Sequence, residues 1–284
     1  MDLTSPSEIK RIMNGLGRGF NKALGQNFLI DRSVLDEIVH ASGIDERYGV
    51  IEIGPGIGTL TAELAKNAKK VVSIELDRQI AEYLKRAFAF DKNVEIINGD
   101  AMKTDFAELI KTRFDGMPCV LVANLPYYIT TPIIMKLLEE EYPFESITVM
   151  IQKEVALRFA AKCGTKDYGA VSLAVQYYTD PCLITEVAPG CFMPPPKVTS
   201  EVIRLDIKDH VRPAVLDEAE LFKVIKASFA QRRKTLVNGL SAVYKDIPKE
   251  QLKKIIAEIG GNENIRGEQL SLEQFIRLAD ALKS

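Results

Sequence analysis

The sequence is poor in histidine and has no patterned cysteine. Only His40 and His210 occur, so we expect neither a metal site nor a nucleophile activated by histidine. The cysteines form no Cys-x-x-Cys pair, which predicts reduced thiols in a reducing compartment instead of a zinc site. They are Cys119, Cys163, Cys182 and Cys191.

Long apolar runs are also lacking. None approaches the roughly 20 residues that a membrane-spanning helix requires. The charged beginning "MDLTSPSEIKRIM" has no signal-peptide core. We therefore expect a cytoplasmic protein with no membrane partner.

Positive charge is concentrated in two stretches, although the net charge is −2. Residues 9–30 and 221–244 contain no acid. Each stretch fits a solvated surface, and the two together fit a phosphate backbone running between them. The first holds Lys10, Arg11, Arg18 and Lys22, and the second holds Lys223, Lys226, Arg232, Arg233 and Lys234.

Short, apolar, β-branched runs alternate with helical periods between about residues 30 and 165. This alternation predicts βαβ units, and therefore an α/β fold around a mainly parallel sheet covered on both faces. Two later runs, 182–188 and 200–207, are expected to pair antiparallel at the sheet edge. The five parallel strands are predicted at 50–54, 70–76, 93–97, 119–125 and 146–152.

Beyond residue 209 the strand patterns stop. Three segments, 217–240, 248–260 and 271–283, have the periodicity of amphipathic helices. We therefore predict two domains, 1–207 with the sheet and 208–284 with helices alone.

A glycine-rich turn follows the first predicted strand in "VIEIGPGIGTLT". Gly54, Gly56 and Gly58 leave room for a ligand to approach the backbone, although a tight strand-to-helix turn alone would also explain them. Thr59 stands where the dinucleotide fingerprint has its last glycine. The motif thus predicts a ligand crevice without identifying the ligand.

Acidic residues end the next two predicted strands. Glu75 is placed to accept hydrogen bonds from ribose hydroxyls, and Asp100 from an adenine amino group. Either one alone is equally well explained as a helix cap. Because carboxyl ends of parallel strands share one edge, the combination predicts a nucleoside site. Both NADH and S-adenosylmethionine carry an adenosine.

The stretch "NLPYY" ends the fourth predicted strand. An exocyclic adenine amine is a poor nucleophile because its lone pair is delocalised into the ring. The Asn124 side-chain oxygen and the Leu125 carbonyl are suitable acceptors for its two N–H groups, which frees that lone pair. Pro126 stiffens the turn, and Tyr127 offers a ring on which a base can stack. The turn resembles the Asn-Pro-Pro-Tyr-type motif of amino-methyltransferases.

The chain as a whole resembles the ribosomal RNA adenine N6,N6-dimethyltransferase family. That resemblance implies a Rossmann-like class I S-adenosylmethionine-dependent methyltransferase domain, followed by a small all-helical C-terminal domain. The cofactor would leave as S-adenosylhomocysteine. The matching stretches are "KALGQNFL" (22–29), "EIGPGIGTLT" (52–61), "NLPYYITTPII" (124–134), "FMPPPKVTS" (192–200), "SFAQRRKTLVNGL" (228–240) and "RGEQLSLEQFIRLADAL" (266–282).

The resemblance also implies roles for individual residues. Asn27 and Leu29 would touch the methionine part of the cofactor, and Asn124 would lie beside both substrates. Phe192 would close the second face of the target adenine opposite Tyr127, unless it is a hydrophobic plug between the last two strands. The prolines at 194–196 would hold that loop and Lys197 would meet a phosphate. Thr199 departs from the acid that the family often has.

By the same resemblance, the substrate would be a pair of adjacent adenosines in the loop of the 3′-terminal hairpin of small-subunit rRNA. Single-stranded loops suit an enzyme that must extrude a base. Members of the family act on an assembling 30S-type subunit, and nothing in the sequence requires more than a monomer. Arg232, Arg233 and Lys234 would hold rRNA phosphates, the alternative being a solvated helix face.

Three other functions remain open from the sequence. A resistance-type methylase of large-subunit rRNA shares the catalytic turn, although the "AQRRKTL" and "RGEQLS" stretches favour the small-subunit branch. A non-catalytic assembly or transcription factor would not need an intact "NLPY" turn. An NAD-dependent oxidoreductase is supported only by the nucleotide crevice.

Overall fold

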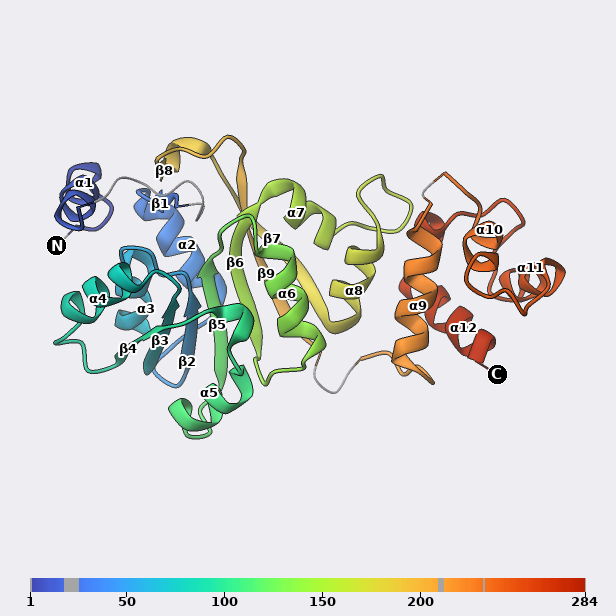
Figure 1. The fold of residues 1–284 in the computed structure, drawn as a ribbon, viewed down its shortest axis with the longest axis horizontal. Coiled ribbons are helices and arrows are strands. Elements are labelled where there is room, and N and C mark those ends of the chain that lie inside the picture. The colour runs from blue at the N-terminus through green and yellow to red at the C-terminus, as the bar shows by residue number, and fades with distance from the viewer. Residues whose placement is uncertain (1, 18–25, 209–211, 232, 284) are drawn as a thin grey trace. The chain divides into compact units, whose positions relative to one another are not determined.

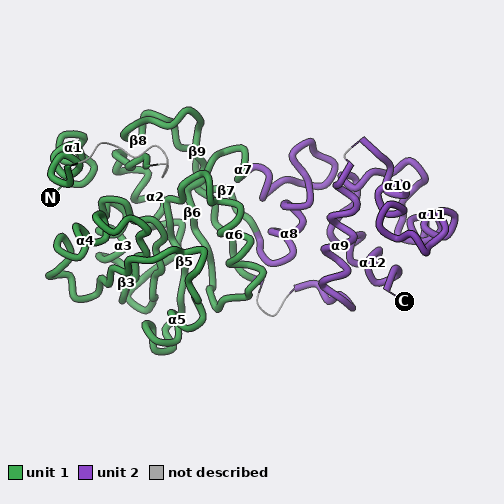
Figure 2. The backbone as a smooth tube through the Cα atoms, viewed as in Figure 1, with its two compact units in different colours: residues 1–156, 181–207 green, residues 157–180, 208–284 purple. Residues whose placement is uncertain are grey.

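The computed structural model describes residues 2–17, 26–208, 212–231 and 233–283. The chain forms two compact units, drawn in different colours in Figure 2. Unit 1 comprises residues 1–156 and 181–207, and unit 2 comprises 157–180 and 208–284. Unit 2 thus includes a segment that our sequence-based division assigned to the first domain. The domain boundary at 207 and 208 stays a prediction.

A seven-stranded sheet forms the centre of unit 1, in the order β4-β3-β2-β5-β6-β9-β7 (Figure 1). Strands β2 to β6 pair in parallel, and β9 runs antiparallel to β6. The predicted α/β class and all five parallel strands are confirmed. The strands are β2 (Gly49–Ile53), β3 (Lys70–Glu75), β4 (Val94–Asn98), β5 (Cys119–Asn124), β6 (Ser146–Gln152), β7 (Thr179–Val187) and β9 (Ser200–Ile207).

Helices follow the strands where the sequence supplies caps. The Asp77 carboxylate accepts from the amides of Gln79 and Ile80 at the start of α4, which satisfies groups that the helix leaves unpaired. Asp31 caps α2 in the same way. The helical elements up to residue 191 are α1 (Pro6–Gly15), α2 (Arg32–Ser42), α3 (Thr59–Asn67), α4 (Arg78–Ala87), η2 (Ala101–Lys103), α5 (Phe106–Phe114), α6 (Thr130–Glu139), α7 (Lys153–Phe159), α8 (Ala170–Tyr178) and η3 (Pro189–Cys191).

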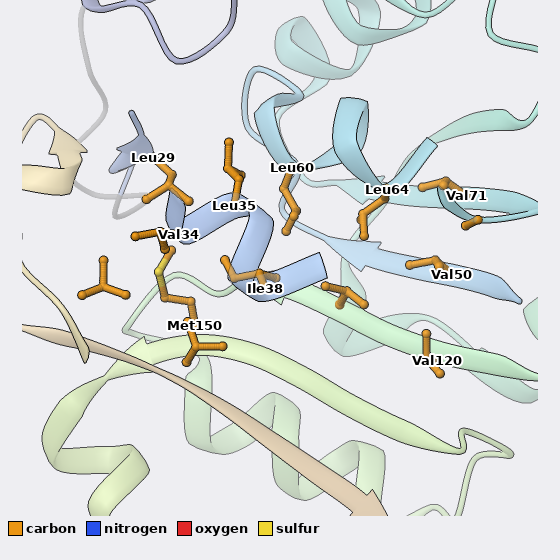
Figure 3. Close-up of a cluster of buried hydrophobic side chains, with 14 of the residues drawn as sticks. Leu29, Val34, Leu35, Ile38, Val50, Leu60, Leu64, Val71, Val120 and Met150 are labelled. Atoms are coloured by element: carbon orange, nitrogen blue, oxygen red, sulfur yellow. The ribbon is translucent and has the colours of Figure 1, made fainter. Parts of the chain in front are cut away.

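One face of the sheet is covered by α2 and α3. Leu35 and Ile38 of α2 belong to one buried cluster with the strand residues Val50, Val120 and Met150 (Figure 3). These five side chains are almost completely buried. Burial of such a side chain stabilises the fold by about 1.5–3 kcal/mol, so this layer fixes the strands whose ends form the site.

A short antiparallel pair joins two distant segments. Strand β1 (Phe28–Leu29) pairs with β8 (Phe192–Met193), with Leu29 opposite Phe192. The Ile30 amide extends the pairing by donating to the Cys191 carbonyl at 2.8 Å. The loop before β9 is thereby attached to the segment that precedes α2. No local pattern in the sequence indicates this pairing.

Unit 2 is helical, as the sequence predicts. The segment 217–240, however, forms two helices and not one continuous helix. Gly239 packs so closely on α9 that a Cβ atom there would lie 2.8 Å from the Ala227 carbonyl oxygen. The chain must turn to make this contact. Besides α8, unit 2 contains α9 (Glu218–Phe229), α10 (Leu236–Ser241), α11 (Lys249–Glu258), η4 (Gly267–Gln269) and α12 (Leu272–Lys283).

All four cysteines are free thiols. Within residues 2–17, 26–208, 212–231 and 233–283, no helix has both the length and the apolar character needed to cross a bilayer.

Candidate functional site

A cavity of about 280 Å³ opens at the carboxyl ends of the central parallel strands. Its wall contains nearly all of the site residues expected from the sequence. Phe192 and Gly58 do not line it. The predicted residues that line it are Asn27, Leu29, Gly54, Gly56, Glu75, Asp100, Asn124, Leu125 and Tyr127.

The glycine turn forms the floor of this cavity. Gly54 and Gly56 have φ angles of 68° and 58°, a backbone region that side chains disfavour. A Cβ atom on Gly56 would also lie 3.0 Å from the Phe28 ring. The turn therefore keeps its backbone bare where a ligand would approach.

Glu75 ends β3 and is only 7% exposed. Its carboxylate accepts a hydrogen bond from the Asp77 amide at 2.8 Å. Burial raises the pKa of Glu75 to about 7, and hydrogen bonds from the backbone amides of Asp77 and Gly56 oppose the shift. Near neutral pH this group therefore changes between a hydrogen-bond donor and a pure acceptor.

Asp100 lies at the next strand end and serves as a cap. One of its carboxylate oxygens accepts from the Met102 amide at 2.9 Å, at the start of η2. The same residue lines the cavity, as do Ala101 and Met102. The sequence-based alternatives of cap and ligand acceptor are thus compatible, because a carboxylate has acceptor sites to spare.

The Asn124 amide is oriented by the backbone. Its Nδ2 donates to the Asn27 carbonyl oxygen at 3.3 Å. Because the two ends of an amide point in different directions, this bond leaves Oδ1 as the group available to the cavity. Asn124 therefore presents an acceptor, and Asn27 contributes to the site through its backbone.

The rest of the turn is fixed by packing. Leu125 is 1% exposed, and its amide donates to the Met150 carbonyl at 3.2 Å. The Tyr127 and Ser200 hydroxyls lie 2.7 Å apart, within hydrogen-bonding distance. Burial raises the pKa of Tyr127, so this ring remains neutral at physiological pH. The turn is consequently held at both ends.

Phe192 lies in the core and not at the cavity wall. It is 3% exposed and packs in the same cluster as Leu29, Val34 and Leu35. This placement fits the alternative of a hydrophobic plug. The structure does not bring Phe192 to the cavity beside Tyr127, so its role as a second stacking face stays a prediction.

Replacement of Phe192 by alanine should lower the free energy of unfolding by about 3–5 kcal/mol, since it would empty a buried aromatic position. Urea denaturation of the full chain measures this loss. A loss below about 1 kcal/mol would contradict the packing role and favour a ring that is free to meet a base.

The cavity wall also contains residues that were not anticipated, among them Glu52 and Phe28. Glu52 is 1% exposed and accepts from the hydroxyls of Thr61 at 2.6 Å and Ser73 at 2.7 Å. Burial raises its pKa to about 7. The sequence feature that could have revealed Glu52 is an acid within an apolar strand, directly before the glycine turn. Phe28 also lines the cavity, and its packing against Ile57 depends on contacts that a single sequence does not display.

The basic residues of the two stretches differ in their exposure and in whether they form ion pairs. Lys226, Arg233 and Lys234 are exposed in unit 2. Lys10 is exposed in unit 1, whereas Arg11 forms an ion pair with Glu8 at 2.6 Å. Arg18, Lys22 and Arg232 lie outside the described residues.

Known relatives match this chain in sequence along almost its whole length. Residues 17–284 match the family model described as ribosomal RNA adenine dimethylase. The ribosomal RNA small subunit methyltransferase A of Bacillus cytotoxicus is 49% identical, over 99% of this chain and 97% of the relative. That of Alkaliphilus oremlandii is 46% identical, over 99% and 98% respectively.

Solved structures agree. A dimethyladenosine transferase from Plasmodium falciparum has a TM-score of 0.74 and 28% identity, over 88% of this chain and 95% of that one. The 23S rRNA methyltransferase ErmE has a TM-score of 0.69 and 25% identity, over 91% and 100%. These likenesses confirm the predicted Rossmann-like methyltransferase fold. The chain belongs to the ribosomal RNA adenine dimethylase family.

Proposed function

We propose that this protein transfers methyl groups from S-adenosylmethionine to the N6 amino groups of two adjacent adenosines, in the 3′-terminal hairpin loop of small-subunit rRNA. The observation that carries this is that Asn124 lines the same cavity as Glu75 and the glycine turn, with its Nδ2 bound to the Asn27 carbonyl oxygen. Relatives of matching length that are named for the small subunit support this choice over the large subunit.

The cavity residues fit the cofactor. The bare backbone at Gly54 and Gly56 accommodates a ligand that approaches closely, and a Cβ atom would narrow that space. Glu75 offers carboxylate oxygens for two ribose hydroxyls, and Asp100 an acceptor for the adenine amine. Asn27 and Leu29 also line the cavity, and by the family resemblance they would contact the methionine part. When bound, S-adenosylmethionine supplies a methyl group on a positively charged sulfur.

Asn124 and Leu125 prepare the nucleophile. Hydrogen bonds from the adenine N–H groups to the Asn124 Oδ1 and the Leu125 carbonyl favour a pyramidal nitrogen with a directed lone pair. The donation from Asn124 Nδ2 to Asn27 preorganises this acceptor at no cost during the reaction. Positioning, and not a general base, then accounts for the rate.

Tyr127 provides the surface for the extruded base. Its hydroxyl is anchored at Ser200, so the ring is ordered before the base arrives. Stacking of a base on an aromatic ring contributes about 1–3 kcal/mol, which offsets part of the cost of removing the base from its stack.

The exposed cations of unit 2 are suited to rRNA phosphates. Lys226, Arg233 and Lys234 add sequence-independent affinity that weakens with salt. The base contacts in unit 1 would then specify the target. We further propose action by a monomer in the cytoplasm on an assembling 30S-type subunit.

Mass spectrometry of rRNA nucleosides from cells lacking the gene tests the proposal. We expect N6,N6-dimethyladenosine to disappear from small-subunit rRNA and to return with a plasmid copy. Persistence of the nucleoside would refute the assignment.

Cofactor affinity should decrease below about pH 7. Burial raises the pKa of Glu75 in the free protein to about 7, so the folded state favours the protonated carboxyl more than the unfolded state does. The stability that this contributes is fully present below about pH 4.5 and is lost as the pH rises through about 7. Ligand binding has the opposite sense, because ribose hydroxyls require the carboxylate. From about pH 8 to about pH 6 the Kd should rise roughly tenfold.

Titration calorimetry with 5′-methylthioadenosine measures this dependence, since that ligand carries no amino acid group that would titrate. Glu75→Gln is the matched control. It should bind weakly and equally at both pH values. A Kd for the unaltered protein that is the same at both pH values would contradict the assignment of Glu75.

A further inference from the structure

We propose that Lys136 is a positioning residue that holds the adenosine side of the cavity against the helix that follows the catalytic turn. This inference rests on the proposed function. Lys136 lies on α6, which begins at Thr130, directly after the "NLPYY" turn. Its ammonium group reaches the turn η2, which follows β4 and supplies another part of the cavity wall.

The ammonium group is surrounded by backbone carbonyls. Lys136 Nζ lies 2.7 Å from the Thr104 carbonyl oxygen, 3.0 Å from that of Met102 and 3.5 Å from that of Ala101. It also lies 5.5 Å from the centroid of the Phe106 ring. Three converging acceptors match the three donors of an ammonium group, and the aromatic face adds a cation–π contact.

The Met102 and Thr104 carbonyls lie at the C-terminal end of a single 3₁₀ turn, where a helix leaves carbonyl groups without helical donors. The Ala101 carbonyl accepts from the Thr104 amide at 3.3 Å as well as from Lys136. The side chain that supplies the donors comes from an element 32 to 35 residues further along the chain. The contact is therefore tertiary, and it fixes the turn relative to α6.

The same turn forms the cavity wall. Asp100, Ala101 and Met102 line the cavity, and Met102 keeps 38% of its surface exposed. If the adenine of the cofactor binds beside these residues, Lys136 holds the part of the cavity wall that contacts it. The turn before α6 would hold the target amine. One lysine thus links the two sides of the reaction.

Lysine is chemically suited to this position. Methionine has a similar length but no donor, so Lys136→Met would leave carbonyls with fewer partners and a looser turn. Arginine keeps the charge and the aromatic contact. No single nitrogen of its planar fork can donate three hydrogen bonds, so Lys136→Arg should restore the function only in part.

The test is titration calorimetry of the full chain with S-adenosylhomocysteine and with 5′-methylthioadenosine, which lacks the methionine part. Lys136→Met should raise the Kd of both ligands by the same factor, about tenfold, as expected for lost charged hydrogen bonds. Lys136→Arg should fall between it and the unaltered protein. In turnover assays the KM for the cofactor should rise while kcat stays within about threefold.

The matched control is Lys111→Met, which removes an exposed lysine from the neighbouring helix α5. It should bind both ligands as the unaltered protein does. Unchanged affinity in Lys136→Met, or an effect on S-adenosylhomocysteine alone, would overturn the inference. If Lys136→Met does not fold, unchanged affinity in Lys136→Arg would overturn it equally. Failure of the unaltered protein to bind either ligand would instead reject the proposed function, and this inference with it.

Discussion

Replacement of Asn124 by alanine should reduce methyl transfer by at least about 10²–10³-fold while RNA binding stays nearly unchanged. The substitution removes the oxygen that accepts from the target amine, a contact that matters most as charge develops on the nitrogen. It also releases the Asn27 carbonyl from its bond with Asn124 Nδ2. Affinity for rRNA rests mainly on phosphate contacts elsewhere and should persist.

Single-turnover assays with labelled S-adenosylmethionine measure the rate, and filter binding measures the RNA affinity. Asn93→Ala is the structural control. The Asn93 amide also donates to backbone carbonyls, of Ala65 and Ala68, but it lies before β4 at the opposite edge of the sheet. It should cost stability without slowing transfer. Equal turnover in Asn124→Ala and the unaltered protein would exclude Asn124 as the acceptor.

Replacement of Gly58 by alanine should lower the free energy of unfolding by about 2–5 kcal/mol. Gly58 precedes α3 with a φ angle of 90°, and a Cβ atom there would lie 2.6 Å from the Phe88 ring. Left-handed backbone strain costs about 1–2 kcal/mol, and a forced shift of packed side chains about 1–3 kcal/mol more. Urea denaturation measures the sum.

Gly116→Ala separates the two contributions. Gly116 has a φ angle of 75°, but no atom lies within 4 Å of the position that its Cβ would occupy. It should therefore show only the backbone strain of about 1–2 kcal/mol. Equal losses of unfolding free energy in Gly58→Ala and Gly116→Ala would mean that the Phe88 ring moves aside with no energetic penalty.

Most of the cavity could be predicted from sequence because its residues follow from one rule. Gly54, Glu75, Asp100 and Asn124 each stand at or just beyond the end of a strand with a strong apolar pattern. Parallel strands place those ends side by side, so the strand assignment was enough to predict that these residues lie close together.

The features that escaped prediction depend on contacts distant in sequence. Phe192 was expected at the cavity by resemblance, yet its pairing with Leu29 places its ring in the core. Lys136 was not singled out from the sequence, because the carbonyls that it contacts lie on another element. The break within 217–240 likewise brings Gly239 of α10 against Ala227 of α9. No local pattern contains such information.

The most direct test of the central claim is incubation of the purified protein with labelled S-adenosylmethionine and with small or large ribosomal subunits that lack adenine dimethylation. We predict label in N6,N6-dimethyladenosine of the small-subunit rRNA alone, and none with Asn124→Ala. Label in the large-subunit rRNA alone, or no transfer by a protein that binds the cofactor, would contradict the account.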